Sequence, residues 1–590
     1  ISTFAYTSCM PVAAPRRPWL DALPEQLALE GLGGEGADPD VPVVGLRDQP
    51  SEQRQSPVAI DFEEAGNVSI IGAGGTGKTS ALLTLAASLS ADPAAGPVHL
   101  YAIDAAGGAL DALADLPTVG AVAPLGDLEL TERVIRRVLE VIGERGPRFA
   151  AARAGGLRAY RGTPGGMAEP RVVLLIDGFA AFRQATETLG GPASLYQMLG
   201  EIMSTGRSVG VHVVLTSDRP SAIPAAMAST LQQQYVLRLA SPHDYGYLGV
   251  PGDALGEAPP GRALLAGDDE EIQFALVGGE HELAAQAEAI DRLASRLRES
   301  GAPRAPEVRN APERILLDEL PALVAGRAVY GIDTRTLEAI GMPARGLGVI
   351  SGPAGSGLST AALSCIAGLG RWAEGRGEEL DTVLLTMIPE GLRAHAGWGR
   401  VGYGEDEVRD LARELTVALG GRPAGRPGIA PIGGMIGGPI GAPAALIGDR
   451  GGEHGAGETD PPVFPRPGTR GVVVVERPAE AEGTEALTEL VALARAARRS
   501  EVLVLFEFEQ GTGAGIWDLF TALKQPGWGL ALQPDEGEGQ SPFRETFGRV
   551  RRADFPPGRG FAVESGRVTP VHVAEASGTL VLRSAFADDS

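Results

Sequence analysis

A strand-like apolar run, a glycine-rich loop and a helix-compatible run follow one another between residues 67 and 86. The loop has the spacing Gly-x-x-x-x-Gly-Lys-Thr, in which glycines let backbone N–H groups curl around phosphate oxygens. The helix N-terminus adds a dipole that favours the same anion. An ordinary glycine-rich turn is the alternative, and the Lys-Thr pair argues against it. The pattern therefore predicts a phosphate-binding loop made of Gly72, Gly74, Gly75, Thr76, Gly77, Lys78, Thr79 and Ser80.

Three residues are expected to bind ATP and Mg²⁺ through their side chains. Lys78 is expected to reach the β- and γ-phosphates, and Thr79 to hold Mg²⁺. The apolar run 172–177 has the form of a Walker B strand, whose last residue, Asp177, would bind the same Mg²⁺ through water. The alternative is a core strand that ends in a solvated Asp. Gly178 follows where many related motor ATPases place a Glu that activates water, so we expect ATP binding with slow hydrolysis.

Short apolar runs alternate with helix-compatible stretches in the first half of the chain. The strand-like runs are 68–72, 98–104, 172–177, 211–216 and one near 235–239, and the helical stretches include 131–144 and 280–298. Buried strands that alternate with helices indicate a mostly parallel sheet covered on both faces. The predicted fold class is therefore α/β, and together with the phosphate-binding loop it indicates a P-loop NTPase domain.

The second half repeats this plan. Its strand-like runs are 348–351, 382–386, 472–476 and 502–508, and a second glycine-rich loop spans 352–359. Both halves end in Pro-Gly-Arg, at 260–262 and 557–559. We therefore expect two tandem ATPase-like domains: a linker over 1–40, an ATPase domain over 41–300 with the intact loop, a linker over 301–312, and a degenerate ATPase domain over 313–580. A Gly/Pro-rich insertion over 421–470 is too poor in apolar residues to fold alone.

The run 206–220 carries two more candidate residues. Thr216 ends a strand beside the expected γ-phosphate, which makes it a candidate sensor. Arg207 is a candidate arginine finger, a cation that completes a neighbouring subunit's site. The alternative for Arg207 is a surface side chain. His212 lies in an apolar run and is expected to be a hydrogen-bonded core histidine rather than a ligand.

The second loop has lost its chemistry. Leu358 stands where the phosphate-binding Lys should be, and Glu476 stands where the Walker B Asp should be. Alignment of 211–216 with 502–507 puts Glu507 at the position of the sensor Thr, and we expect weak or absent ATP binding here because a contact is lost and repulsive charge is added. The same alignment puts Arg498 opposite Arg207, so Arg498 is a possible trans-acting finger. The alternative is a surface arginine in a cluster with Arg495 and Arg499.

Composition limits the classes of function. A net charge of −24 argues against a broad nucleic-acid-binding face, which would need clustered Lys and Arg. The two cysteines, Cys9 and Cys365, exclude a disulfide framework and a Cys-based metal site, and they fit a reducing cytoplasm. No run of about 18 apolar residues predicts a transmembrane helix. The chain begins at Ile1 and not at Met, so we expect it to be part of something longer, with any membrane anchor upstream or on a partner.

The combined motifs resemble the FtsK/SpoIIIE-type ATPases, and more closely the EccC/EssC coupling ATPases of type VII (ESX) secretion. The resemblance covers about residues 15–275 well and 313–575 in layout only. It is carried by Pro18-Trp19-Leu20, Leu23-Pro24, Gly45-Leu46-Arg47-Asp48, Gln55-Ser56-Pro57, Tyr101-Ala102-Ile103-Asp104, Leu116-Pro117-Thr118-Val119-Gly120, Gly206-Arg207, Arg219-Pro220 and the closing Pro-Gly-Arg of each half.

In that family a membrane-anchored protein carries three ATPase modules, and this chain looks like modules two and three. The resemblance implies that the last module binds the C-terminal signal, Tyr-x-x-x-Asp/Glu, of small helical-hairpin substrates. It implies an upstream membrane-anchored module as a partner, a possible homo-hexamer, and a place at the cytoplasmic face of the membrane. Arg207 would serve the upstream module and Arg498 the site at 72–79. Apolar candidates for the signal pocket are Ile516, Trp517, Leu519 and Phe520, which a core helix explains equally well.

Two other classes of function compete with this hypothesis. A DNA-translocating motor of the FtsK kind would need the missing Glu at position 178, working second sites and a basic channel. A scaffold that never binds nucleotide would not need Lys78, Thr79 or Asp177. We expect no nucleic-acid partner.

Overall fold

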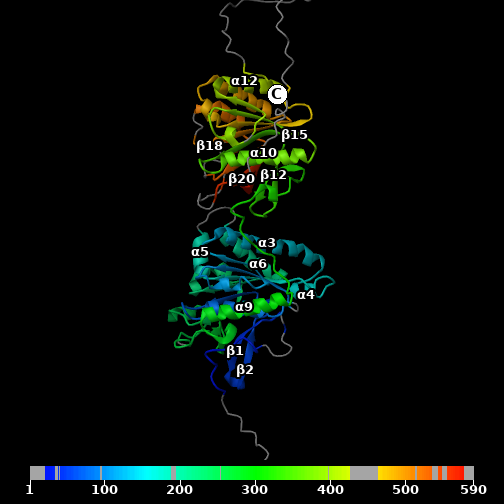
Figure 1. The fold of residues 1–590 in the computed structure, drawn as a ribbon. Coiled ribbons are helices and arrows are strands. Elements are labelled where there is room, and N and C mark those ends of the chain that lie inside the picture. Colours follow the sequence, from blue (N-terminus) through cyan, green and yellow to red (C-terminus); the bar gives the residue numbers. More distant parts are fainter. Residues whose placement is uncertain are drawn as a thin grey trace, which may run out of the picture. The chain divides into compact units, whose positions relative to one another are not determined.

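The fold is described from a computed structural model, in which the chain forms two compact units, Ile1–Asn310 and Ala311–Ser590 (Figure 1). The structure describes residues 20–32, 38, 40–93, 96–187, 194–252, 254–395, 397–424, 463–511, 515–534, 542–545, 547 and 555–576. Pro18, Trp19 and most of the predicted insertion lie outside the described residues. No helix among the described residues is long and apolar enough to cross a membrane.

The first unit is built on a ten-stranded mixed sheet. Its six central strands are parallel, and four antiparallel strands extend it at one side. In spatial order they are β2 (Arg54–Ala59), β1 (Val43–Gln49), β10 (Glu271–Phe274), β9 (Arg262–Leu265), β8 (Leu231–Leu237), β3 (Asn67–Ile71), β7 (Val211–Ser217), β6 (Arg171–Asp177), β4 (Val98–Asp104) and β5 (Val119–Pro124).

Helices cover both faces of this sheet. Strands β3, β6 and β7 are buried along their whole length, which explains why their sequences are continuously apolar instead of alternating. Helices α2 (Lys78–Ser90) and α9 (Leu283–Glu299) contribute to one core cluster, and α3 (Leu128–Ala151), α5 (Phe179–Glu187) and α6 (Leu195–Thr205) contribute to the other. Shorter helices are α1 (Phe62–Ala65), α4 (Leu157–Arg161), α7 (Ala225–Ala228) and α8 (Pro242–Gly246).

The second unit repeats the strand order of the first. Its path runs through β11 (Leu323–Val324), β12 (Arg327–Asp333), β21 (Arg567–Val573), β20 (Arg559–Glu564), β19 (Trp528–Leu532), β14 (Gly346–Gly352), β18 (Leu503–Glu509), β17 (Thr469–Glu476), β15 (Glu379–Thr386) and β16 (Arg400–Tyr403), with β13 (Ala339–Met342) paired to β12. Helix α10 (Leu358–Glu374) contributes to one core, and α12 (Gly404–Ala418), α13 (Glu485–Ala497) and α14 (Trp517–Leu523) to the other. The remaining helix is α11 (Leu392–His395).

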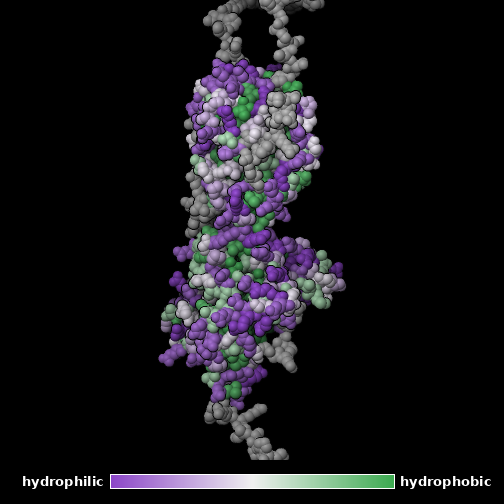
Figure 2. All heavy atoms as spheres, in the orientation of Figure 1, coloured by the Kyte–Doolittle hydropathy of each residue, from purple (hydrophilic) through white to green (hydrophobic). Residues whose placement is uncertain are grey.

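The predicted fold class, two tandem α/β P-loop domains with mostly parallel sheets, is confirmed. The predicted parallel strands match β3, β4, β6, β7, β8, β14, β15, β17 and β18 within a few residues. Sequence reasoning did not identify the antiparallel strands at the other side of each sheet, because strands such as β1 and β2 contain many polar residues and so carry little hydrophobic pattern. Hydrophilic residues predominate on the visible face of each unit (Figure 2).

Candidate functional site

The first glycine-rich loop joins β3 to the N-terminus of α2, as predicted. Gly75 and Gly77 have φ angles of +74° and +98°, which L side chains rarely adopt. A Cβ atom on Gly77 would lie 2.9 Å from the backbone nitrogen of Gly261, so no larger residue fits there. By contrast, the space beside Gly74 and Gly75 is open to 4 Å. The loop is thus a cradle of backbone around open space, which is the shape that a phosphate group needs.

Lys78 lies across this cradle. Its Nζ donates hydrogen bonds to the carbonyl oxygens of Gly72 (2.7 Å) and Ala73 (2.9 Å) and forms an ion pair with Asp218 at 2.8 Å. The Lys78 side chain is only 12% exposed, whereas Asp218 is 72% exposed. An exposed carboxylate is weakly held, so Asp218 leaves Lys78 available to a phosphate that enters the cradle.

Asp177 accepts hydrogen bonds from two hydroxyl groups. The Thr79 hydroxyl donates to Oδ2 at 2.7 Å, and the Thr216 hydroxyl donates to Oδ1 at 2.5 Å. Burial raises the pKa of Asp177, the two hydroxyl groups oppose that shift, and the nearby charge of Asp104 adds to it. The carboxylate of Asp104 is itself held by the backbone N–H groups of four residues in the following loop, Ala106, Gly107, Gly108 and Leu110.

These residues fit a nucleotide and its magnesium ion. Oxygen ligands suit Mg²⁺, and the structure brings the Thr79 hydroxyl and the Asp177 carboxylate together from α2 and β6. They would hold Mg²⁺, which supplies positive charge beside the phosphates, while the loop and Lys78 would hold the phosphates themselves. Thr216 is placed to orient Asp177, and its hydroxyl also accepts a hydrogen bond from the backbone N–H of Gly178 at 2.8 Å.

Gly178 is held in a conformation that excludes other residues. Its φ is +82°, and a Cβ atom there would lie 3.0 Å from the carbonyl carbon and oxygen of Ala105. A Glu after the Walker B Asp would therefore be disfavoured by the backbone conformation at this position.

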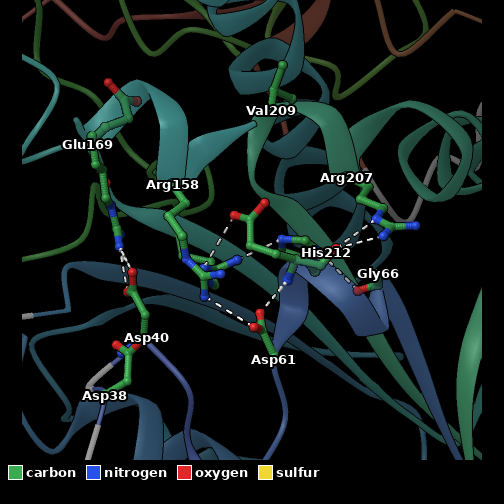
Figure 3. A network of polar contacts seen from close by, with 12 residues as sticks. Asp38, Asp40, Asp61, Gly66, Arg158, Glu169, Arg207, Val209 and His212 are labelled. Atoms are coloured by element: carbon green, nitrogen blue, oxygen red, sulfur yellow. Dashed lines mark hydrogen bonds and ion pairs between the residues drawn. The ribbon is translucent and has the colours of Figure 1, made fainter. Parts of the chain in front are cut away.

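Arg207 lies far from this site within its own unit. Its side chain lies beside Gly66, the residue that precedes β3, whereas the glycine-rich loop follows the other end of β3. Its guanidinium donates to the carbonyl oxygen of Glu63 through Nη2 (2.7 Å) and Nε (3.1 Å). Arg207 therefore belongs to a polar network at the opposite end of the strands (Figure 3), and its role as a finger for another module stays a prediction.

His212 is a buried core histidine, as expected. Arg171 donates to its Nε2 at 3.1 Å, so Nδ1 carries the proton and donates to the carbonyl oxygen of Gly66 at 2.9 Å (Figure 3). Burial, with the charge of Arg171, lowers the pKa of His212 to about 3. The imidazole is therefore neutral and structural.

The second loop keeps the backbone of the first but not its chemistry. Gly357 has a φ of +90°, and Leu358, which replaces the lysine, is 8% exposed and packs into the core. Strand register places Glu476 and Glu507 opposite each other, as Asp177 and Thr216 are in the first unit. This arrangement puts a carboxylate where the first unit has a hydroxyl.

The two glutamates take different roles. Glu507 accepts a hydrogen bond from Ser359 at 3.3 Å, and its second oxygen has no partner among the described residues. Burial, reinforced by the charge of Glu476, raises the pKa of Glu507 to about 7. Glu476 instead binds the hydroxyl of Thr386 (2.7 Å) and the backbone N–H of Leu392 (2.9 Å). Its carboxylate thus closes the loop after β15, the task of Asp104 in the first unit.

The other predicted residues of the second unit are engaged within it. Arg498 donates to the carbonyl oxygens of Ala522, Lys524 and Gln525, and burial lowers its pKa. Its guanidinium is therefore used to hold the end of α14, and a finger role would require those bonds to break. Of the pocket candidates, Ile516 and Leu519 are core residues and Phe520 stacks on Phe508, whereas Trp517 is 68% exposed.

Sequence reasoning missed two features of the first site. Asp218 was not singled out, and only the fold brings it to Lys78. The Pro-Gly-Arg motif was noted as a repeat, but its contact with the phosphate loop, in which the Gly261 N–H donates to the Thr76 carbonyl at 2.9 Å, was not foreseen. The repetition of that motif at the end of both units was the available signal.

The chain is similar in sequence to several known proteins. The FtsK/SpoIIIE family matches residues 43–251. ESX-4 secretion system protein EccC4 of Mycobacterium tuberculosis is 32% identical over 316 residues, which is 52% of this chain and 24% of that protein. ESX-1 secretion system protein EccCb1 of Mycolicibacterium smegmatis is 28% identical over 285 residues, 47% of each. The chain thus spans about a quarter to a half of the curated relatives that it matches.

Solved structures share the fold of both units. Thermomonospora curvata EccC (ATPases 2 and 3), in complex with a signal sequence peptide, has a TM-score of 0.66 at 22% identity and covers 95% of this chain and 97% of that one. EssC (ATPases 2 and 3) from Geobacillus thermodenitrificans has a TM-score of 0.67 at 20% identity and covers 94% and 100%. The chain thus carries an FtsK/SpoIIIE domain over residues 43–251, and in sequence and fold it is similar to the EccC/EssC-type ATPases of type VII secretion.

Proposed function

We propose that this chain is the tandem-ATPase portion of a type VII secretion coupling ATPase that binds ATP in its first unit and recognises secreted substrates through its second. The observation that carries the proposal is the difference between the two loops. The first unit gathers Lys78, Thr79 and Asp177 around an open cradle. The second replaces the lysine by Leu358 and faces Ser359 with Glu507, a buried carboxylate.

Slow hydrolysis follows from the groups around the first cradle. Asp177 is already hydrogen-bonded to Thr79 and Thr216 and would be occupied with Mg²⁺. The next position, Gly178, offers no side chain to activate water. ATP would therefore act mainly as a ligand that sets the state of the first unit, which suits regulation of an upstream motor module.

The peptide-binding proposal rests on the segment that lies against β5, the edge strand of the first unit. A segment in extended form follows the start of β5: Ala305 N–H donates to the Pro117 carbonyl at 2.8 Å, and Val308 N–H donates to the Gly120 carbonyl at 3.0 Å. The Tyr101 hydroxyl donates to the Pro306 carbonyl at 3.1 Å, and Val308 packs against the core cluster. The edge at β5 thus carries an extended, partly apolar segment of the same chain, and it is held there by backbone hydrogen bonds such as those that a bound peptide could make.

In the second unit, β16 holds the position of β5 at the end of the sheet. Tyr403 at its end is 37% exposed and lies 5.0 Å from the guanidinium of Arg393. We place the substrate signal along β16, where an extended segment would add to the edge as residues 305–308 add to β5. The signal sequence peptide bound to Thermomonospora curvata EccC (ATPases 2 and 3) supports a peptide ligand for this part of such proteins.

The remaining partners are part of the same proposal. The upstream, membrane-anchored module would be the motor that this chain regulates, assembled as a hexamer at the cytoplasmic face of the membrane, with Arg207 serving that module's site. Small helical-hairpin proteins that end in the signal would be the substrates. The net charge of −24 favours protein partners over nucleic acid.

Calorimetry with ATP and Mg²⁺, followed by titration with a Tyr-x-x-x-Asp/Glu peptide, tests both parts. We expect one ATP site, abolished by Lys78→Ala, and peptide binding that Tyr403→Ala weakens. Trp517→Ala, which alters another exposed aromatic residue in the described part of this unit, is the matched control. Loss of peptide binding in Trp517→Ala alone would move the site to α14. Two ATP sites with brisk turnover, or salt-dependent DNA binding, would favour an FtsK-like motor instead.

A further inference from the structure

The Pro-Gly-Arg turn near the end of each unit contacts both the glycine-rich loop and the segment that precedes the first strand of that unit. In the first unit, Gly261 N–H donates to the Thr76 carbonyl at 2.9 Å, inside the phosphate loop. The next residue, Arg262, donates through Nη2 to the carbonyl oxygen of Leu23 at 2.9 Å. Leu23 is 4% exposed, so this preceding segment is docked and not loosely attached.

The same arrangement recurs in the second unit. Gly558 N–H donates to the Ser356 carbonyl at 2.8 Å, and Arg559 Nη2 donates to the carbonyl of Ala311 at 2.8 Å. Ala311 begins the segment that precedes this unit. Since the loops of the two units have diverged while both contacts are kept, the contacts belong to the plan of the module and not to one nucleotide site.

Beyond the arginine, each preceding segment adds a short parallel bridge to the end of the last sheet strand. In the first unit Leu29 N–H donates to the Leu276 carbonyl and Leu276 N–H to the Leu27 carbonyl. In the second unit Leu317 N–H donates to the Glu575 carbonyl, and Glu575 N–H donates to the Ile315 carbonyl. The backbone amides of Leu29 and Leu317 are therefore matched reporters of how firmly each segment is docked.

The turn has little freedom to move independently of the phosphate loop. A Cβ atom on Gly77 would lie 2.9 Å from Gly261 N, and one on Gly261, whose φ is +82°, would lie 2.6 Å from Gln273 Nε2. Arg262 is fixed on both sides, because it also donates to Gln273 at 3.0 Å and to Glu271 at 2.6 Å. Backbone and side-chain hydrogen bonds thus form one connected chain from the loop through Gly261 and Arg262 to Leu23.

We propose that Arg262 is a positioning residue that couples nucleotide occupancy of the loop at 72–79 to the docking of the preceding segment, Leu23 to Leu29. This inference rests on the proposed function, because it requires nucleotide in the first loop. Such coupling is reciprocal: nucleotide tightens the segment, and a docked segment raises nucleotide affinity by the same factor. The segment leads toward the upstream module, so the turn gives nucleotide in this chain a route to its neighbour.

Hydrogen exchange of the full chain with and without a non-hydrolysable ATP analogue and Mg²⁺ tests the coupling. We expect exchange at the Leu29 amide to slow by about fivefold or more with nucleotide, since that is the lower range of ordinary coupling. The amide of Leu317, beside the altered loop, is expected not to change. Arg262→Ala should remove the effect at Leu29 and weaken nucleotide binding by the same factor.

Two further variants keep the test decisive. Arg262→Lys retains the charge and the packing of the stem but not the three-way set of bonds, so it should fold as wild type and still lose the effect. Lys78→Ala should keep Leu29 at its nucleotide-free exchange rate. Unchanged exchange at Leu29 while calorimetry shows bound nucleotide would overturn the coupling and leave the ATP site intact. An equal effect in Arg262→Lys would also overturn it. Absence of nucleotide binding would overturn the coupling together with the proposed function.

Discussion

Replacement of Gly178 by glutamate tests whether the backbone, and not only the sequence, keeps the first site slow. The substitution restores the residue that activates water in related motors. It also forces an L side chain into a φ of +82°, where the left-handed region costs about 1–2 kcal/mol. Its Cβ would lie 3.0 Å from the Ala105 carbonyl group, and relief of such overpacking costs about another 1–2 kcal/mol. We therefore expect Gly178→Glu to destabilise the first unit by about 2–4 kcal/mol.

Scanning calorimetry is the suitable assay, because a chain with two units need not unfold in one step. For a unit of this size, each kcal/mol lowers Tm by about 2–4 °C, so the transition of the first unit should fall by roughly 5–15 °C. Gly178→Ala, which carries the strain without the carboxylate, should show a similar fall. Phosphate release by Gly178→Glu should not rise above wild type, because relief of the strain moves Asp177 and Thr216 out of place.

The second unit offers a matched control at the same position. Arg477 follows Glu476 there with a φ of +43°, so a larger residue already bears the left-handed strain. Arg477→Gly relieves that strain and loses a contact with Glu509 at 3.5 Å, so its effect on stability should be small. A Gly178→Glu protein that had the same Tm as the wild type and hydrolysed ATP about tenfold faster would contradict this reasoning.

Four other substitutions should have distinct outcomes. Lys78→Ala should abolish ATP binding in calorimetry without a change in the fold seen by circular dichroism, because Lys78 is the only lysine at the described loop; stoichiometric binding by the variant would contradict the site. Glu507→Gln should flatten the pH dependence of the free energy of unfolding of the second unit. In the wild type the folded-state pKa of Glu507 is raised from 4.5 to about 7. The wild-type free energy of unfolding is therefore full below pH 4.5 and falls by about 3 kcal/mol as the pH rises to 7. Denaturant unfolding at pH 5 and pH 7.5 would show this, and it would be refuted if the variant and the wild type lost the same free energy of unfolding between these two pH values. Leu358→Lys alone should not create a second ATP site, because Glu507 still faces the loop, and calorimetric stoichiometry decides this. Arg207→Ala should leave the ATP affinity of this chain within about twofold, because the guanidinium is bound to Glu63 at the other end of β7; a large loss would place Arg207 in its own unit's site.

The sequence by itself determined the fold class and the duplication, and it located the candidate phosphate loop. Continuous apolar runs such as 172–177 predict strands buried on both faces, because only such strands have no solvent side to mark with polar residues. The loop at 72–79 was readable because phosphate binding by backbone demands glycines at fixed spacing, followed by Lys-Thr. The losses at Leu358 and Glu476 were readable for the same reason, by comparison of the two halves.

Only the tertiary structure decided what the remaining residues do. Arg207 and Arg498 align in sequence, yet Arg207 binds Glu63, which lies 144 positions before it, and Arg498 binds the end of α14, which lies 24 positions after it. Glu476 turns to the loop after β15, and Glu507, not Glu476, meets Ser359. Gly261 contacts Thr76 in the phosphate loop, and Arg262 contacts Leu23, so each of these contacts joins residues that are far apart in the sequence. Local sequence patterns carry no signal for such contacts, because they arise only when the sheet brings its strands together.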